Sequence, residues 1–195
     1  VTDLSALLAG TAGPGTATVD GNVAQLSGVT SNASSAATNA LTIVVDDVAT
    51  AAQGAAIADS TSIATVDFSA AGVSDTFANI VAAGTGAVSA NMAKIDAKDA
   101  NVNVTVSGTQ ANVTSANVTD LNALLAATTG TVTATIDGNI AQLKNVTSNA
   151  SSAATNVLSI TVDDAANLSD AKKVVDSTNK TGGTAIDFAG GISDS

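Results

Sequence analysis

The chain alternates short runs of β-branched residues with Ala-rich segments of helical periodicity. In these runs polar and apolar residues alternate and the run ends on Asp, as in residues 18–20 and 65–67, while residues 105–107 have Ser in place of Asp. Alternation with a period of two predicts a strand with one buried face. We expect the inward positions to be Val19, Val45, Val66, Val106, Ile136, Val162 and Ile186. The Thr and Asp residues then lie on the opposite face.

Short helices are predicted between these strands. Residues 2–10 begin with a capping Thr, carry apolar residues at helical spacing and end on Gly, and residues 119–130 repeat this pattern. Ala favours the helix in most of the other segments. The further helices are expected over residues 49–58, 74–82, 92–100 and 166–175.

The strongest pattern in the sequence is an internal repeat. Residues 1–8 return as 118–125, and residues 29–35 return unchanged as 146–152, each 117 residues later. That period is too long for a single supersecondary unit. We therefore predict a first long repeat of about four coils over residues 1–117 and a second, incomplete copy over residues 118–195. Since the second copy stops before it is complete, we expect the chain to be a segment of a longer protein.

The order of strands and helices predicts an α/β fold. Strands joined by helices pair in parallel, because a hairpin does not accommodate a helix between its strands. The prediction is a repetitive solenoid with parallel β-strands on one side, short helices on the other and Ala in the interior. The alternative is an antiparallel β-sandwich. It would need more hairpin signals than the Asp-Gly-Asn motifs at 20–22 and 137–139.

The composition excludes several kinds of chemistry. All 17 acidic residues are Asp and all six basic residues are Lys, for a net charge of -11. Since His and Cys are absent, the sequence offers no Ser-His-Asp triad, Cys nucleophile, disulfide or typical zinc site. The lack of Arg argues against a nucleic-acid partner. The sequence contains no run of about 18 bulky apolar residues, so no membrane span is predicted. We predict a protein that is not an enzyme.

The Asp residues at the strand ends are the candidates for chemistry. Equivalent residues in a parallel stack lie about 4.8 Å apart, so these carboxylates would face one another and need compensation. Under one hypothesis each Asp forms an Asx turn or caps the next helix. Under the other they bind Ca²⁺, which prefers oxygen ligands; no other cofactor is expected. The candidate ligands are Asp20, Asp46, Asp47, Asp67, Asp137, Asp163, Asp164 and Asp187.

Two surface features add weaker hypotheses. Thr-x-Thr pairs at residues 16–18 and 133–135 have the arrangement that ice-binding solenoids present to water, although Thr is also a common strand residue. Asn32 and Asn149 lie in Asn-x-Ser acceptors of the repeated phrase and are candidate glycosylation sites.

Three phrases of the sequence resemble a known group of proteins. Residues 74–80 (SDTFANI), 123–136 (ALLAATTGTVTATI) and 158–164 (LSITVDD) are similar to repeats of giant secreted and cell-surface proteins of marine cyanobacteria and other bacteria, including giant proteins required for swimming motility. The resemblance implies an extracellular or cell-surface protein with an adhesive or scaffolding role, and it supplies no catalytic residues. An acidic, Cys-free chain rich in Thr, Ser and Asn fits this location.

Two functions of different class follow. The first is a structural or adhesive repeat, such as a stalk, matrix or filament segment, whose partners are adjacent repeats, identical subunits, or a glycan or cell surface. The second is a ligand-binding surface on which the Thr/Asp strand face holds calcium, a glycan or ice.

Overall fold

The structure is a computed structural model in which the chain forms two compact units. The first comprises residues 1–74 and 90–103, and the second residues 75–89 and 104–195, so the chain passes between the units inside the first sequence repeat. The residues that the structure describes are 15–27, 40–59, 63–68, 70–146, 156–178 and 185–194.

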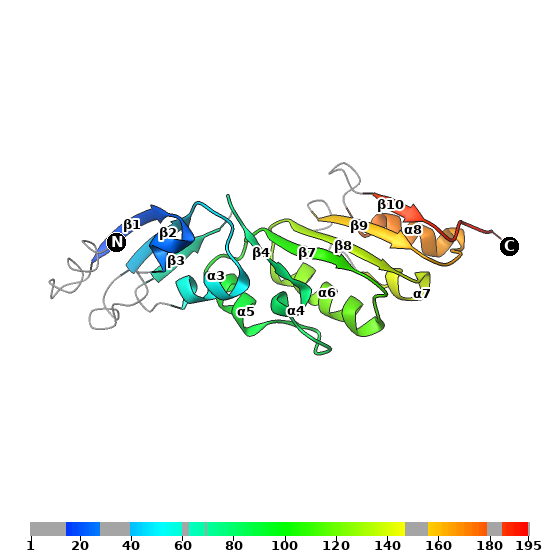
Figure 1. Cartoon of the computed structure of the whole chain (residues 1–195), viewed down its shortest axis with the longest axis horizontal. Helices are drawn as coiled ribbons and strands as arrows, with labels where there is room; N and C mark the ends of the chain where they lie inside the picture. Colours follow the sequence, from blue (N-terminus) through cyan, green and yellow to red (C-terminus); the bar gives the residue numbers. More distant parts are fainter. Residues whose placement is uncertain are drawn as a thin grey trace. The chain divides into compact units, whose positions relative to one another are not determined.

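The first unit contains a three-stranded parallel sheet in the order β1-β2-β3 (Figure 1). These strands are β1 (Thr16–Gly21), β2 (Ala40–Val45) and β3 (Ile63–Asp67). The helices of this unit are α2 (Val23–Leu26), α3 (Ala51–Ala58) and α5 (Ala90–Asp96). Each strand of the sheet is followed by a turn or helix before the next strand begins, as parallel pairing requires.

The core of the first unit lies between the sheet and the packed helices α3 and α5. A small residue lets these helices approach closely, because a Cβ atom at Gly54 would lie 2.8 Å from Cδ1 of Ile95 and 3.4 Å from the ring of Phe68. The largest fully buried side chains of this unit are Leu26, Leu41, Ile43, Ile57, Phe68, Met92 and Ile95.

The second unit is built on parallel strands β7 (Val104–Gln110), β8 (Val132–Gly138), β9 (Val157–Val162) and β10 (Ile186–Phe188). The sheet order is β10-β9-β8-β7-β4, and the chain passes from the first unit to the second within β4 (Val73–Thr76). The helices are α4 (Phe77–Ile80), α6 (Ser115–Ala127), α7 (Ile140–Leu143) and α8 (Leu168–Asp176). A short antiparallel hairpin joins β5 (Val81–Ala82) to β6 (Ala87–Val88).

Parallel pairing of the main strands confirms the α/β prediction at the level of fold class. All pairs described among β1–β3 and among β7–β10 are parallel, as the antiparallel sandwich would not allow. The predicted inward residues are buried at Val45, Val66, Val106, Ile136 and Val162. Val19 and Ile186 are half-buried, because they lie on the edge strands β1 and β10.

The expected register is wrong by two residues. We expected Val19, Val45 and Val66 to lie side by side, but Val19 lies opposite Ile43, which lies opposite Val66. Val45 lies opposite Gly21 instead. A shift of two residues keeps every side chain on its face of the sheet, so the pattern of apolar residues does not distinguish the two registers.

The predicted helices are confirmed at four of the five segments that the structure describes, within a few residues at the ends; residues 2–10 lie outside the described part of the chain. The exception is 74–82, where only α4 is helical and the flanking residues belong to β4 and β5. Val81 pairs there with Val88 across a turn. The Asp-Gly-Asn motifs do not form hairpins either, because Asn22 and Asn139 begin the short helices α2 and α7.

Within the described ranges, none of the helices has the length and apolar character needed to cross a lipid bilayer.

Candidate functional site

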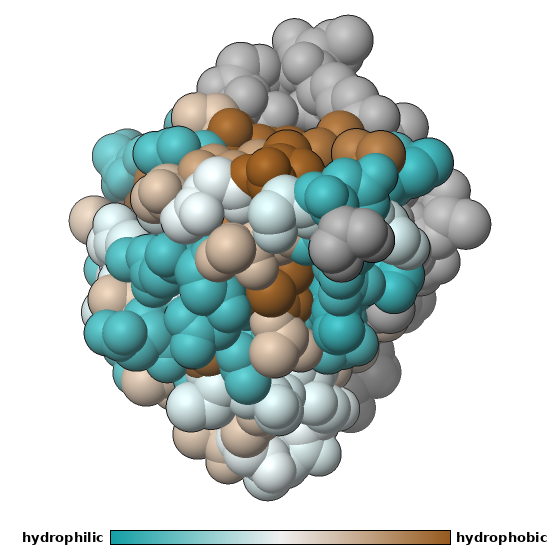
Figure 2. All heavy atoms as spheres, turned by 90° about the vertical axis from the view of Figure 1, so that its right-hand side faces the viewer, coloured by the Kyte–Doolittle hydropathy of each residue, from teal (hydrophilic) through white to brown (hydrophobic). Residues whose placement is uncertain are grey.

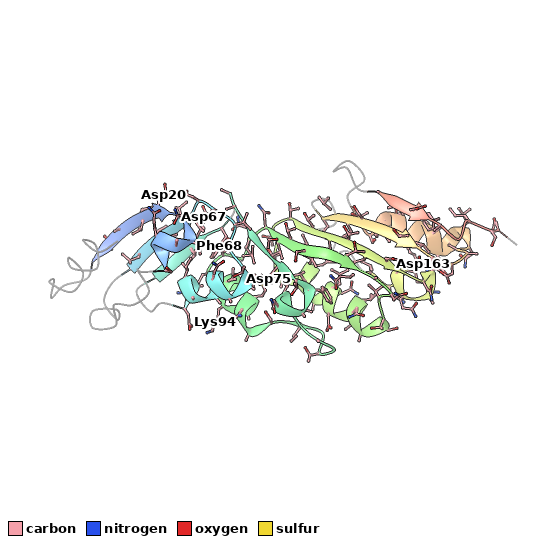
Figure 3. The ribbon with its side chains drawn as sticks, in the orientation of Figure 1. Asp20, Asp67, Phe68, Asp75, Lys94 and Asp163 are labelled. Atoms are coloured by element: carbon pink, nitrogen blue, oxygen red, sulfur yellow. The ribbon has the colours of Figure 1, made fainter. Side chains whose placement is uncertain are left out.

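Two pairs of carboxyl groups occupy equivalent places, one in each unit. Asp46 follows β2 and its N–H donates to the carbonyl of Gly21, at 3.0 Å, which brings it beside Asp20. Asp163 follows β9 and donates in the same way to Gly138, at 3.0 Å, which brings it beside Asp137. Asp20 and Asp163 are labelled in Figure 3. The backbone pairing of successive strands therefore forces like charges together in both units.

The pKa values of the second carboxyl in each pair are raised. For Asp46 the hydrogen bond with Asp20 is the largest cause, followed by burial and by the negative charges of Asp20 and Asp47. For Asp163 burial comes first, followed by the hydrogen bond with Asp137 and the charges of Asp137 and Asp164. In addition, Oδ1 of Asp137 is buried without a hydrogen-bond partner in the described part of the chain. Each pair thus retains a proton to a higher pH than an isolated carboxyl does.

Asp47 and Asp164 each bind the short helix that follows the preceding strand of their sheet. Oδ1 of Asp47 accepts a hydrogen bond from the N–H of Val23 at 2.6 Å, and Oδ1 of Asp164 accepts one from Ile140, also at 2.6 Å. These N–H groups lie in the first turns of α2 and α7, and N–H groups at that position have no acceptor within their own helix. A carboxylate also suits the positive end of a helix. Each of these carboxylates therefore caps the helix that precedes it in the chain, whereas the sequence hypothesis placed the cap on the next helix.

Asp67 and Asp187 do not complete a carboxylate ladder. Strand pairing puts Val44 between Asp20 and Asp67, because both residues lie opposite it. Thr161 separates Asp137 from Asp187 in the same manner. The expected row of three facing Asp residues is therefore wrong in both units, and the two-residue register shift is the reason. In the described ranges no group of three or more His, Cys, Asp or Glu side chains is arranged to hold a metal ion.

Three buried carboxylates, Asp99, Asp120 and Asp170, were not predicted from the sequence, and the first two bind backbone N–H groups. Asp99 accepts from the N–H of Phe68 at 2.7 Å and from that of Asn101 at 3.3 Å. Asp120 accepts from Gly84 at 2.6 Å and from Gly86 at 2.8 Å, which holds the turn of the β5–β6 hairpin. A signal for Asp120 was present, because it interrupts the apolar face of a repeated helix and recurs as Asp3. Both carboxylates accept hydrogen bonds from backbone N–H groups.

The Thr/Asp face of the first unit carries an open polar depression of about 350 Å³. Its lining includes Thr42, Thr65, Asp67, Lys98 and Asn101. Thr65 and Thr42 are hydrogen-bonded through their hydroxyls at 3.3 Å. The candidate glycosylation residues Asn32 and Asn149 lie outside the described residues.

A pH-dependent gain in stability is expected for Asp163→Asn. Because the folded-state pKa of Asp163 is raised, its protonated form stabilises the folded chain at acid pH, and this contribution is lost as the pH rises through that pKa. The Asn amide donates to Asp137 at every pH. The variant is therefore expected to melt a few degrees higher than the parent at pH 7, with the difference disappearing near pH 3. Melting followed by circular dichroism between pH 3 and 8 measures this.

Asp187→Asn is the matched control, since this strand-end Asp lies opposite Thr161 rather than beside a carboxyl. A gain at pH 7 equal to that of Asp163→Asn would contradict the pairing argument.

Asp170 contributes to stability with the opposite sign, because hydrogen bonds from Lys173 and Lys144 lower its pKa to about 2. Its contribution is present above the ordinary carboxyl pKa and is lost as the pH falls toward 2.

Comparison of the chain with protein-family models, curated proteins and solved structures found no match. The function is therefore inferred from the residues and their geometry.

Proposed function

We propose that the chain is a non-enzymatic structural repeat of an extracellular or cell-surface protein, serving as part of a stalk, matrix or filament. Its partners are adjacent repeats or identical subunits, and the array contacts a glycan or a cell surface. The composition and the resemblance to repeats of giant secreted proteins support the location. The proposed arrangement is an α/β solenoid in which each coil is fastened to the preceding one.

The observation that carries this proposal is the repeated carboxylate link between coils. Asp47 and Asp164 are 117 residues apart, and each accepts the first free N–H of a short helix in the preceding coil at 2.6 Å. A link that recurs in equivalent places belongs to the architecture of a repeat, in which each unit contacts its neighbours. The most deeply buried carboxylates, Asp99 and Asp120, are likewise engaged by backbone N–H groups.

A structural role also agrees with the available side chains. General acid–base chemistry at neutral pH most often uses His, and covalent catalysis often uses Cys; the sequence has neither. The raised pKa values at Asp46 and Asp163 arise at strand ends where the same pairing recurs, so the repeat explains them without a reaction.

Labelling of intact cells tests the location and role. Antibodies against the purified chain are expected to label the surface of intact cells of the source organism, and deletion of the gene is expected to weaken adhesion or change the surface layer. The control is an antibody against a cytoplasmic protein, which labels only permeabilised cells. Labelling by the chain's antibody that also requires permeabilisation would overturn the proposal.

Calcium binding is the second candidate function, and the paired carboxyls favour it. The Asp137–Asp163 pair lies beside Asp164 and contains a buried oxygen without a hydrogen-bond partner in the described residues. Ca²⁺ would supply the positive charge that balances the two neighbouring carboxylates. If the pairs bind it, millimolar CaCl₂ raises the melting temperature by several degrees over a chelator. The double variant Asp46→Asn/Asp163→Asn then loses this rise. No rise in the parent chain excludes the calcium function.

A further inference from the structure

The same local arrangement occurs near the end of both β3 and β10. After each strand a Gly of positive φ turns the chain, Gly72 at 76° and Gly191 at 80°. The carbonyls of these Gly residues accept from the N–H groups of Ala49 and Ala166, at 3.2 and 3.0 Å. The next residues, Val73 and Ile192, then form isolated parallel bridges to the same two alanines. The helices α3 and α8 follow those alanines, so they are equivalent too.

In the first unit, residues 90–103 cover this arrangement. Helix α5 packs on α3, and Met92 and Ile95 are buried there. The carboxylate of Asp99 accepts from the N–H of Phe68 at 2.7 Å, and the carbonyl of Asn103 accepts from Val73 at 2.8 Å. As a result Phe68 is 0% and Val73 1% exposed.

In the second unit the equivalent residues are open. Ile192 is 52% exposed, and Leu168 is 58% exposed although the equivalent Ala51 is fully buried. Phe188, the equivalent of Phe68, is half-buried. Figure 2 faces the end of the second unit that carries β10 and α8, and apolar residues gather over part of it. An apolar cluster of this kind marks a surface that another element covers.

The backbone at this end is open as well. The carbonyl of Ala185 accepts a hydrogen bond from the N–H of Ile160, so the backbone groups of Ala185 point toward β9. Because these directions alternate along a strand, the backbone N–H of Phe188 points away from β9, at the open edge of the sheet. The N–H of Ile192 points outward for the same reason, because Gly191 and Ser193 make the bonds to Ala166. In the first unit the equivalent N–H groups, those of Phe68 and Val73, donate to the carboxylate of Asp99 and the carbonyl of Asn103.

A charged group at the end of each helix supports the comparison. Asp59, at the end of α3, forms an ion pair with Lys94 of the covering helix at 2.8 Å. Asp176 occupies the equivalent place in α8 and instead pairs with Lys172 of its own helix. The carboxylate that receives the covering segment in the first unit is thus present in the second.

We propose that the face formed by α8, β10 and Ile192 is a docking surface for a further copy of the segment 90–103, presented by a repeat that continues from residue 195. This inference rests on the proposed function and names its partner surface. The apolar helix of that segment covers Leu168 and Ile192, and its Asp accepts the N–H of Phe188. Lys172 occupies the position equivalent to Ala55, which is buried in the first unit. In the docked state the methylene chain of Lys172 lies beneath the docked helix, while its ammonium group remains at the edge beside Asp176.

Thiol labelling tests this surface directly, because the chain contains no Cys. The full chain is compared with a chain that continues after Ser195 with a copy of residues 77–146. Leu168→Cys and Ile192→Cys report on the surface, and Val48→Cys is the matched control, since Val48 is 56% exposed in the first unit. The extension is expected to slow labelling at positions 168 and 192 by about tenfold or more, with no change at position 48.

A second extension carries Asp in place of both Met92 and Ile95 within the appended copy, and it is expected to restore the fast labelling. Equal labelling rates at positions 168 and 192 with and without the extension would overturn the proposal, as would equal protection by the second extension. The experiment uses purified chains, so its result does not depend on where the protein resides in the cell. Failure of surface labelling on cells would remove the proposed function and leave this measurement as it stands.

Discussion

Phe68→Ala is expected to lower the free energy of unfolding of the first unit by about 3–5 kcal/mol. The Phe68 ring is fully buried and lies against the close contact between α3 and α5 at Gly54. Its removal leaves a cavity that the small residues around it cannot fill, so both the transfer free energy and the packing are lost. Figure 3 labels Phe68 in this unit. Urea unfolding followed by circular dichroism at 222 nm measures the loss, because the chain has no Trp or Tyr for fluorescence.

Phe188→Ala is the matched control, since it removes the same ring from the equivalent place in the second unit. Phe188 is half-buried, so the expected loss there is below about 2 kcal/mol. Hydrogen exchange assigns each change to its unit. Equal losses for the two variants would show that the coverage of Phe68 by residues 90–103 adds nothing to stability.

Asp120→Ala is expected to destabilise the second unit by about 3 kcal/mol, the second-largest effect we predict. Asp120 is 1% exposed, and its two oxygens accept from Gly84 and Gly86. The substitution leaves both N–H groups in the hairpin turn without their acceptor, and hydrogen bonds to charged groups are the stronger kind. Urea unfolding gives the free energy, and hydrogen exchange at Gly84 and Gly86 is expected to accelerate most.

Asp120→Asn separates the charge from the shape. The amide keeps one acceptor oxygen, so it satisfies one of the two N–H groups while its NH₂ faces the other donor. Its loss is expected to be smaller than that of Asp120→Ala but clearly measurable. If neither variant changes the exchange of Gly84 and Gly86, Asp120 does not hold this turn in solution.

The two copies of one sequence motif show how the surroundings change local structure. In the first unit Asn22 and Gln25 form a reciprocal capping box at the start of α2. The equivalent Asn139 starts α7 without a side-chain cap. In both units a carboxylate that follows the next strand, Asp47 or Asp164, caps the helix. This long-range cap is therefore the constant element, and the local cap is the variable one.

The sequence by itself determined which strand residues face inward and four of the five helical segments that the structure describes. Alternation with a period of two identified the buried face at Val66 and Ile136, and Ala-rich segments with helical spacing identified α3 and α8. These patterns suffice because burial of apolar side chains depends on the period of the element, and the period is written in the local sequence. The parallel pairing followed from the length of the connections.

Only the tertiary structure decided the register and the partners of the carboxylates. A two-residue shift leaves the inward face unchanged, so Val19 could pair with Ile43 or Val45 without altering the pattern. That shift places Val44 instead of Asp46 between Asp20 and Asp67, while the backbone bond from Asp46 to Gly21 keeps Asp46 beside Asp20. Asp47 binds a residue 24 positions away in the chain, and Asp120 binds residues 34 and 36 positions away. The local sequence carries no information on which residues so far apart will meet. Long-range pairing is set by how the strands and helices pack, and only the folded chain records it.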